Sequence, residues 1–337
     1  MTNKNYKKLI VFHPYLSRLP IIGELFCGGT NTHTHITLSA STRRVRADRL
    51  FILSLSLFQV VNKAVLRKKH VTGAPSALAL VEREIEVLDS LPRHPNLATL
   101  VEVIDDPSSD KLYICLEHAG CRVGSLPPLR HGEDGAARDE LLSEVLAQAA
   151  RGVGFLHRHG VVHGDLKADH LLCEEDPTFR VRIVDFGSSS RLRVAEGQRW
   201  DLVSKSPGTP AYTAPECCEG GAYGGTKADV WALGVSLYLL RYGGFPFSST
   251  TACDVYEEIR ACRGVELPPP GPNASENLTR ALQGMLQTSP DDRLTAGGIL
   301  ETLLGETDGL KGLGSASVDE IEASYAREVL GGGRRAV

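Results

Sequence analysis

Three short motifs, which follow one another along the chain, constrain its fold more than any other feature. Residues 162–172 read VHGDLKADHLL, residues 185–187 read DFG, and residues 214–216 read APE. A lone DFG tripeptide is a weak signal, because the same residues also occur in ordinary turns. The three motifs together are far more specific, and they predict one site that draws residues from all three segments.

The composition is that of an ordinary globular protein. The chain has 337 residues, of which 42% are hydrophobic and 23% are charged, so it suits one large two-lobed domain or two ordinary ones. Its 37 basic and 41 acidic side chains give a formal net charge of −4. Because no basic excess exists to neutralise phosphates, nucleic acid is not expected as the main partner.

Cysteine usage and hydropathy predict where the chain resides. The eight Cys residues show no CxxC spacing, which argues against a zinc site or a disulfide framework. Every apolar run falls short of the roughly 18 residues that cross a bilayer, so no membrane association is expected. We therefore expect reduced thiols and a cytoplasmic location, with the nucleus as a second compartment.

The hydrophobic pattern predicts strands and one helix first, and mostly helices afterwards. Strands are expected at 60–66, 97–104 and 111–116, and helices at 75–91, 139–157, 229–242, 253–261 and 278–286. This order indicates an α+β fold class with a small β-rich lobe and a large helical lobe. Residues 1–58 are expected to be an atypical segment that is disordered or wrongly assigned from the gene. A partial N-lobe is expected at 59–118, a C-lobe at 119–305 and a tail at 306–337.

The three motifs resemble the active-site motifs of protein kinases. This resemblance implies the bilobal kinase fold, with ATP and Mg²⁺ as cofactors. It implies that Asp165 is the base that receives the proton of the substrate hydroxyl, and that Lys167 steadies the transferred γ-phosphoryl group. Asp185 is implied as the main Mg²⁺ ligand, with Phe186 and Gly187 as structural residues beside it.

The resemblance also implies a nucleotide site that includes residues upstream of these motifs. Lys63, on its expected strand, is the candidate for holding the α- and β-phosphates, and Glu84 is its candidate ion-pair partner. An isolated Lys and Glu would ordinarily be surface residues, and only the downstream motifs favour the functional interpretation. Glu117, Ala119 and Leu172 complete the implied set of ATP-binding residues.

Residues 206–216, SPGTPAYTAPE, form the implied activation segment. Thr209 is expected to bridge Asp165 and Lys167, which favours Ser or Thr over Tyr as the substrate residue. Thr213 belongs to the same segment.

Several further residues are implied as structural. Glu216 and Arg293 are expected to form a buried ion pair in the large lobe, and Asp229 is expected to tie the catalytic loop to the helix beneath it. Leu88, Leu100, His163 and Phe186 are expected in a hydrophobic stack that links the lobes.

More narrowly, the chain resembles the calcium/calmodulin-dependent protein kinase kinases. Within them it is most similar to the plant kinases that bind a geminivirus replication protein and activate SNF-related energy-sensing kinases. The resemblance extends from about residue 59 to about residue 305, and it is carried by HPN at 94–96, LVEVIDDP at 100–107, VHGD at 162–165 and SPGTPAYTAPECC at 206–218. It implies a Ser/Thr kinase whose substrate is the activation-loop Thr of a downstream energy-sensing kinase.

Two features bear on how such a kinase would be regulated. The tail after residue 305 lacks a basic amphipathic helix, so no calmodulin partner is expected. Gly164 replaces the usual Arg before the catalytic Asp, which implies little dependence on phosphorylation of the activation segment. The resemblance makes Thr209 a site of feedback phosphorylation, and a phosphate there would repel Asp165 and inhibit.

The Gly-rich loop that covers the ATP phosphates in protein kinases is missing. Glycines upstream of Lys63 do not fit GxGxxG, and they lie 34 or more residues before it. Residues 24–59 match nothing in the family, and residues 51–59, FILSLSLFQ, are what a pyrimidine-rich splice-acceptor tract would encode. We therefore hypothesise that residues 24–59 are translated intron or a mis-joined exon.

His170 stands where a kinase catalytic loop carries a metal-binding Asn. Mg²⁺ prefers oxygen ligands, so an imidazole nitrogen is a poor substitute, although it is acceptable to Mn²⁺. We expect weakened metal binding and a lower kcat rather than none, because Asp165, Lys167 and Asp185 are present. The alternative interpretation is a pseudokinase scaffold that lacks efficient phosphotransfer.

Overall fold

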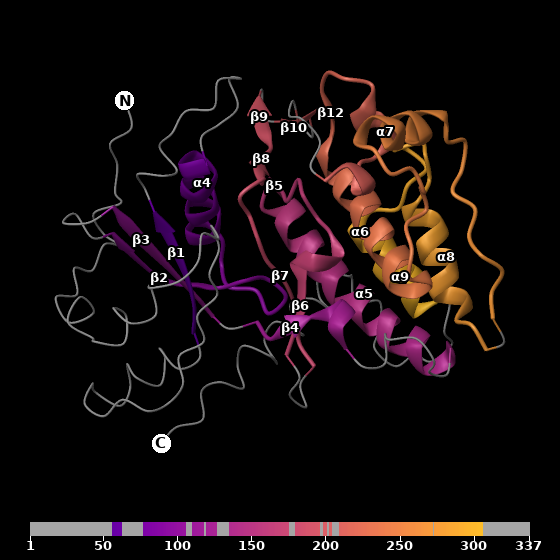
Figure 1. The fold of residues 1–337 in the computed structure, drawn as a ribbon, viewed down its shortest axis with the longest axis horizontal. Coiled ribbons are helices and arrows are strands. Elements are labelled where there is room, and N and C mark those ends of the chain that lie inside the picture. The colour runs from indigo at the N-terminus through magenta and orange to yellow at the C-terminus, as the bar shows by residue number, and fades with distance from the viewer. Residues whose placement is uncertain are drawn as a thin grey trace. The chain divides into compact units, whose positions relative to one another are not determined.

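A computed structural model describes residues 56–62, 77–105, 110–117, 119–126, 135–174, 179–195, 198–200, 202–203, 209–271 and 273–305. The chain divides into two compact units (Figure 1). We call them the N-terminal unit, Met1–Pro92 with Ala98–His118, and the C-terminal unit, Arg93–Leu97 with Ala119–Val337. Among the described residues the first contains a sheet and one helix and the second is mostly helical, which confirms the α+β class.

The N-terminal unit is built on a three-stranded antiparallel sheet. Its elements are β1 (Ser56–Asn62), α4 (Ala77–Ser90), β2 (Leu100–Asp105) and β3 (Lys111–Glu117). The sheet order is β1-β3-β2, so β3 is central, and Ile114 and Cys115 on it are buried. Apolar residues recur at helical spacing along α4, and Ile85 and Leu88 are buried as that spacing requires.

The strands of this unit begin and end at residues other than those expected. β1 begins at Ser56 and ends at Asn62, and its residues 56–59 pair with residues 114–117 of β3. Part of the segment hypothesised as intron-derived therefore contributes a strand to the sheet, while residues 1–55 and 63–76 lie outside the described residues. Leu97 was expected in β2, but it instead forms an isolated parallel bridge with Ile183 in the C-terminal unit.

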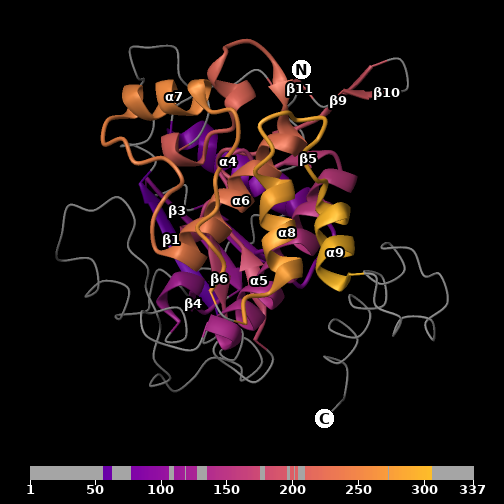
Figure 2. The ribbon, with the colours of Figure 1, turned by 90° about the vertical axis from the view of Figure 1, so that its right-hand side faces the viewer.

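Five helices form the frame of the described C-terminal unit: α5 (Gly135–Arg158), α6 (Gly225–Tyr242), α7 (Ala252–Ala261), α8 (Glu276–Met285) and α9 (Ala296–Leu304). Figure 2 shows α8 and α9 running side by side. α6 is apolar on most of its surface and carries the fully buried Trp231, so it is the core helix of the unit. It ends at Tyr242 and is capped by Gly243, whose φ of 75° lies in the left-handed region that terminates helices.

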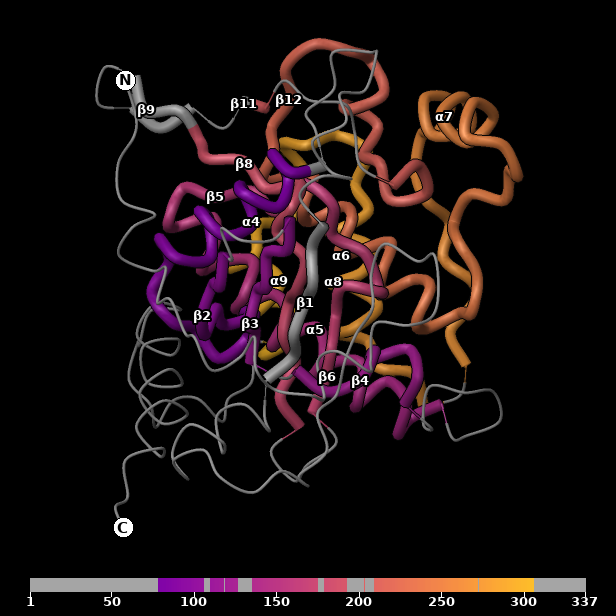
Figure 3. The backbone as a smooth tube through the Cα atoms, turned by 60° about the vertical axis from the view of Figure 1, so that its left-hand side comes forward, coloured from indigo at the N-terminus to yellow at the C-terminus, as the bar shows by residue number. Residues whose placement is uncertain are grey.

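Short strands hold the loops between these helices. A three-stranded sheet has the order β4 (Cys121–Arg122), β6 (Leu171–Cys173) and β7 (Val181–Ile183), and β4 and β6 lie side by side in Figure 3. The remaining strands pair two by two: β5 (Val161–Val162) with β8 (Ser190–Arg191), β9 (Arg193–Ala195) with β10 (Gln198–Trp200), and β11 (Leu202–Val203) with β12 (Tyr223–Gly224).

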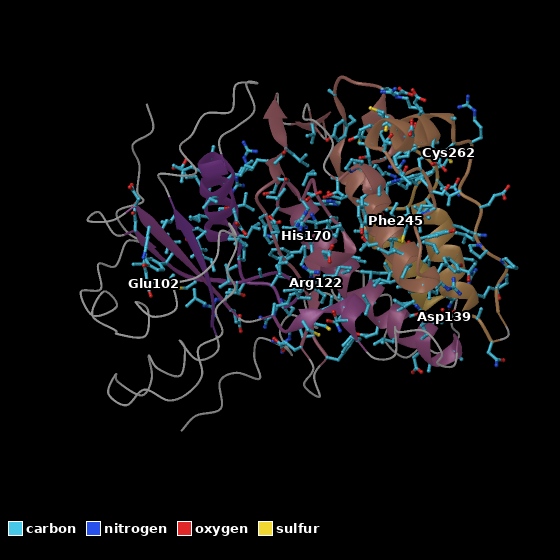
Figure 4. All side chains as sticks on the ribbon, viewed as in Figure 1. Glu102, Arg122, Asp139, His170, Phe245 and Cys262 are labelled. Atoms are coloured by element: carbon cyan, nitrogen blue, oxygen red, sulfur yellow. The ribbon has the colours of Figure 1, made fainter. Side chains whose placement is uncertain are left out.

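A buried ion pair joins three helices of the C-terminal unit. Arg241 of α6 donates through Nε and Nη2 to both carboxylate oxygens of Asp139 on α5, at 3.0 and 2.6 Å (Figure 4 labels Asp139). The same guanidinium donates to Thr279 on α8, and the backbone N–H of Ser275 donates to Asp139. In the part of the chain that is described, no helix is both long enough and apolar enough to cross a bilayer.

Candidate active site

The loop between β5 and β6 is anchored by one buried carboxylate. Asp229 of α6 is 2% exposed, and it accepts hydrogen bonds at 2.9 Å from the backbone N–H groups of His163 and Gly164. Its Oδ2 also lies 2.9 Å from Nε2 of His157 on α5. The expected tie between this loop and the helix beneath it is therefore present, and it fixes where the loop begins.

Gly164 occupies a backbone conformation that excludes most side chains. Its φ is +78°, in the left-handed region where a residue with a Cβ is strained. A Cβ placed on it would lie 2.7 Å from the carbonyl oxygen of Ser188, a backbone atom that cannot rotate away. Any residue with a side chain would therefore be strained at position 164 in this backbone conformation.

The carboxylate of Asp165 is the meeting point of two other candidate residues. Its Oδ2 accepts from Nζ of Lys167 at 3.1 Å. Its Oδ1 accepts from both the backbone N–H and the Oγ1 hydroxyl of Thr209, at 3.0 and 2.9 Å. Thr209 and Lys167 therefore meet at Asp165 through its two different oxygens, whereas the sequence predicted a direct bridge by Thr209 to both residues. Thr213 lies close by, and its hydroxyl donates to the carbonyl oxygen of Thr209 at 3.4 Å.

His170 joins the loop to the DFG motif. Its Nδ1 lies 2.9 Å from the backbone oxygen of Asp165, and its Nε2 lies 3.1 Å from Oδ2 of Asp185. The hydrogen bond from His170 holds the pKa of Asp185 well below its ordinary value, and partial burial acts in the opposite direction. A carbonyl oxygen and a carboxylate oxygen both only accept, so each ring nitrogen of His170 faces an acceptor.

Asp185 itself has an unusual backbone. Its φ is +68°, one of three positive values among the described non-Gly residues. A non-Gly residue in this region is uncommon and is often found at functional sites. The backbone N–H of Gly187 donates to its Oδ1 at 3.3 Å, so the carboxylate is held at both oxygens.

The rings of His163 and Phe186 pack against each other. His163 is fully buried, and its ring centroid lies 5.2 Å from that of Phe186, which is also fully buried. Burial lowers the pKa of His163, so the ring is neutral at pH 7, and its Nε2 lies 3.1 Å from the backbone oxygen of Val184. Two of the four residues predicted in a hydrophobic stack therefore pack against each other within this unit, and the predicted link between the lobes stays a prediction.

The ion pair predicted between Glu216 and Arg293 is present. Both terminal nitrogens of Arg293 donate to the two carboxylate oxygens of Glu216, at 2.6 and 2.9 Å. The guanidinium is fully buried and lies over the ring of Trp231, 5.0 Å from its centroid. It also donates to the carbonyl oxygens of Gln287 and Lys227, so its other donors are satisfied.

The remaining predicted residues for nucleotide binding lie in both units. Glu84 is buried on α4 of the N-terminal unit, and Glu117 is the last residue of β3. Ala119 is buried in the C-terminal unit, where Leu172 pairs with Arg122 across β4 and β6. Lys63 lies outside the described residues, and the assignment of this set to ATP stays a prediction.

His170 and Asp185 could supply two ligands to a divalent cation, which would take its other ligands from elsewhere. Among the described residues no group of three or more His, Cys, Asp or Glu side chains is placed to hold a metal ion. Nε2 of His170 and Oδ2 of Asp185 contact each other directly at 3.1 Å, so a cation held by both would replace this contact. A nitrogen beside a carboxylate oxygen suits Mn²⁺ better than Mg²⁺.

Comparisons with known proteins agree with this geometry. Residues 58–304 match the family model described as protein kinase domain. The Arabidopsis thaliana serine/threonine-protein kinase GRIK1 is 36% identical over 240 residues, which is 71% of this chain and 57% of that protein. GRIK2 of the same plant is 36% identical over 246 residues, 71% of this chain and 56% of that protein. A Caenorhabditis elegans calcium/calmodulin-dependent protein kinase kinase is 33% identical over 235 residues, 68% of this chain and 41% of that protein. The chain thus spans about half the length of these relatives.

Proposed function

This chain belongs to the protein kinase family, and we propose that it is a Ser/Thr kinase acting on the activation-loop Thr of a downstream energy-sensing kinase of the SNF-related or AMP-activated type. The family implies ATP and a divalent cation as cofactors. The observation that carries the proposal is the convergence of Lys167 and Thr209 on the carboxylate of Asp165.

In the proposed reaction Asp165 orients the substrate hydroxyl and accepts its proton. Lys167 and Thr209 hold the two carboxylate oxygens, so the carboxylate is kept in one orientation before the substrate arrives. The positive charge of Lys167 lies where it also stabilises the transferred phosphoryl group. Asp185 and His170 would hold the divalent cation, whose chemistry in kinases is to neutralise charge on the phosphates.

The proposed substrate rests on the resemblance to the plant kinases that activate SNF-related kinases. Its test is phosphorylation of an inactive SNF-related kinase domain by the full chain, followed by mass spectrometry of the activation loop. The matched control substrate carries Ala in place of the activation-loop Thr. We expect phosphate on the Thr and none on the control. Equal labelling of both substrates would contradict the proposed site, and labelling of Tyr would contradict the residue class.

His170 specifically favours a second candidate, a pseudokinase scaffold that binds partners and lacks efficient phosphotransfer. The two candidates differ in one observable outcome, because a scaffold yields no phosphorylated product with any divalent cation. The predicted absence of a Gly-rich loop favours the same candidate, although residues 1–55 lie outside the described residues.

The proposed partners are ATP and the downstream kinase, and neither calmodulin nor nucleic acid is among them. A cytoplasmic location, with the nucleus as a second one, completes the proposal. It is supported by Cys residues that form no disulfide among the described residues.

A further inference from the structure

Two cysteines face each other across the short strand pair β4–β6. Cys121 and Cys173 are register partners in this antiparallel pair, and their Sγ atoms are 3.9 Å apart. Cys173 is fully buried, whereas Cys121 is partly exposed and within reach of a small reagent. Figure 4 labels Arg122, the residue that follows Cys121 in β4.

A glycine brings the two strands together at this point. Gly120 has a φ of +82°, and a Cβ placed on it would lie 1.8 Å from the carbonyl oxygen of Cys173. Only a residue without a side chain permits this approach. Partners in an antiparallel pair have Cα atoms about 4.5–5.5 Å apart, which lies within the roughly 4.4–6.8 Å that disulfides span. Bond formation needs the sulfurs to approach by about 1.9 Å, to a length of about 2.05 Å.

We propose that Cys121 and Cys173 form a reversible disulfide when the chain meets a low-molecular-weight disulfide such as glutathione disulfide. The Cys121 thiolate attacks one sulfur of the reagent and releases one glutathione thiolate, leaving a mixed disulfide. The Cys173 thiolate then attacks the Cys121 sulfur and releases the second glutathione. The two protein thiols together lose two electrons and two protons, and glutathione disulfide gains them as two molecules of glutathione.

The other described thiols lack this arrangement. Cys217 and Cys218 are adjacent in the sequence, and Cys115 belongs to the N-terminal unit. Cys253 on α7 is exposed and serves as an internal reference for a thiol that reacts without a cross-strand partner. Among the described residues, Cys121 and Cys173 form the only sulfur–sulfur contact between cysteines.

The bond would act on the nucleotide site, a consequence that rests on the proposed function. Ala119 lies two residues before Cys121, and Leu172 directly precedes Cys173; both are predicted ATP-binding residues. Closing the sulfur gap turns the side chains beside these two residues, and displacements of about 1 Å at a positioned site can cost as much as about 100-fold in activity. We expect the oxidised chain to bind ATP several-fold more weakly.

The first experiment tests the bond alone, on the reduced full-length chain incubated with glutathione disulfide. We expect loss of two thiols, a mass decrease of about 2 Da and a peptide map that joins Cys121 to Cys173, all reversed by dithiothreitol. The Cys253→Ser control should form the same bond. Cys173→Ser should stop at a glutathione adduct on Cys121. A map with adducts on Cys253 alone, or a bond from Cys121 to Cys27, would overturn the proposal.

The second experiment measures the affinity of a fluorescent ATP analogue for the reduced and oxidised chain. A several-fold loss on oxidation that is absent in Cys121→Ser supports the effect on the nucleotide site. An unchanged affinity with the bond formed would overturn that effect. If neither state binds the analogue while the bond still forms, the disulfide site stands and the proposed kinase function fails.

Discussion

Nε2 of His170 lies 3.1 Å from a carboxylate oxygen of Asp185, the residue implied as the main metal ligand of the site. Its other ring nitrogen contacts the backbone oxygen of Asp165 at 2.9 Å. Metal-binding histidines commonly donate their second nitrogen to a backbone carbonyl, which orients the ring and fixes its tautomer. His170 therefore contacts both the loop and the DFG motif, through two different ring nitrogens.

Replacing this imidazole by the usual amide should change which cation the enzyme prefers. We expect His170→Asn to raise kcat with Mg²⁺ and to lower the Mn²⁺-to-Mg²⁺ activity ratio by about tenfold, because the amide supplies an oxygen that Mg²⁺ favours. Mn²⁺ affinity, measured by electron paramagnetic resonance with a non-hydrolysable ATP analogue, gives a readout that does not depend on turnover. An unchanged ratio together with unchanged affinity would show that His170 does not contact the cation.

The hydroxyl of Thr209 should matter for turnover. A hydrogen bond to a charged group contributes about 1.5–3 kcal/mol, and Thr209 donates one to Asp165 from its side chain. We expect Thr209→Ala to lower kcat by about tenfold with little change in KM for ATP, whereas Thr209→Ser keeps the hydroxyl and most of the activity. Thr209→Glu should be less active than Thr209→Ala, because its charge repels Asp165. Equal kcat for the Ala and Ser variants would contradict this role.

The ion pair between Arg293 and Glu216 should stabilise the C-terminal unit. Removing one partner of a buried pair costs about 3–5 kcal/mol, and here the fully buried Arg293 is lost while Glu216, 15% exposed, is left without its partner. Arg293→Ala should lower the free energy of unfolding by this amount in urea titrations. The matched control is Arg122→Ala, which removes an exposed pair with Asp169 and should cost less than about 1 kcal/mol. Similar costs for both variants would contradict the account.

Stability should fall on mild acidification because of His94. Burial lowers the pKa of His94 from 6.5 to about 3. As pH falls below 6.5 the unfolded chain binds a proton that the folded chain does not, so the stabilisation present above that pH is lost progressively down to about pH 3. The slope attributable to His94 reaches at most about 1.4 kcal/mol per pH unit.

Urea titrations of His94→Gln at several pH values between those limits test this expectation. Gln retains an acceptor for the backbone N–H of Asn96, which donates to Nδ1 of His94 in the wild type. The variant should show a shallower decline with acidification than the wild type. It should keep part of the slope, because the pKa of buried His163 is also lowered. Identical slopes would contradict the assignment to His94.

The elements with long periodic patterns were predicted from the sequence. Features that depend on local backbone geometry, such as very short strands, were not predicted. α5 and α6 were predicted because their apolar residues recur over several turns, although both begin earlier than expected. Strands of two residues, such as β4, carry no periodicity and were not predicted. β2 begins three residues later than expected, because Leu97 pairs with Ile183 instead.

In the candidate site, too, the sequence predicted residue identities but not the contacts that depend on the fold. The motifs identified Asp165 and Asp185, since residue identity alone carries that signal. The double contact of His170 and the left-handed backbone of Gly164 depend on where distant segments meet, which no local pattern encodes. The contact between Cys121 and Cys173 likewise joins residues 52 positions apart.

Phosphotransfer by the full-length chain tests the central claim most directly. The measurement is transfer of labelled γ-phosphate from ATP to an SNF-related kinase domain, with Mg²⁺ and with Mn²⁺, beside Asp185→Ala as the inactive reference. The account predicts transfer above this reference, greater with Mn²⁺ than with Mg²⁺. Transfer equal to the reference with both cations, from a chain that still binds ATP, would contradict the kinase assignment and favour a scaffold.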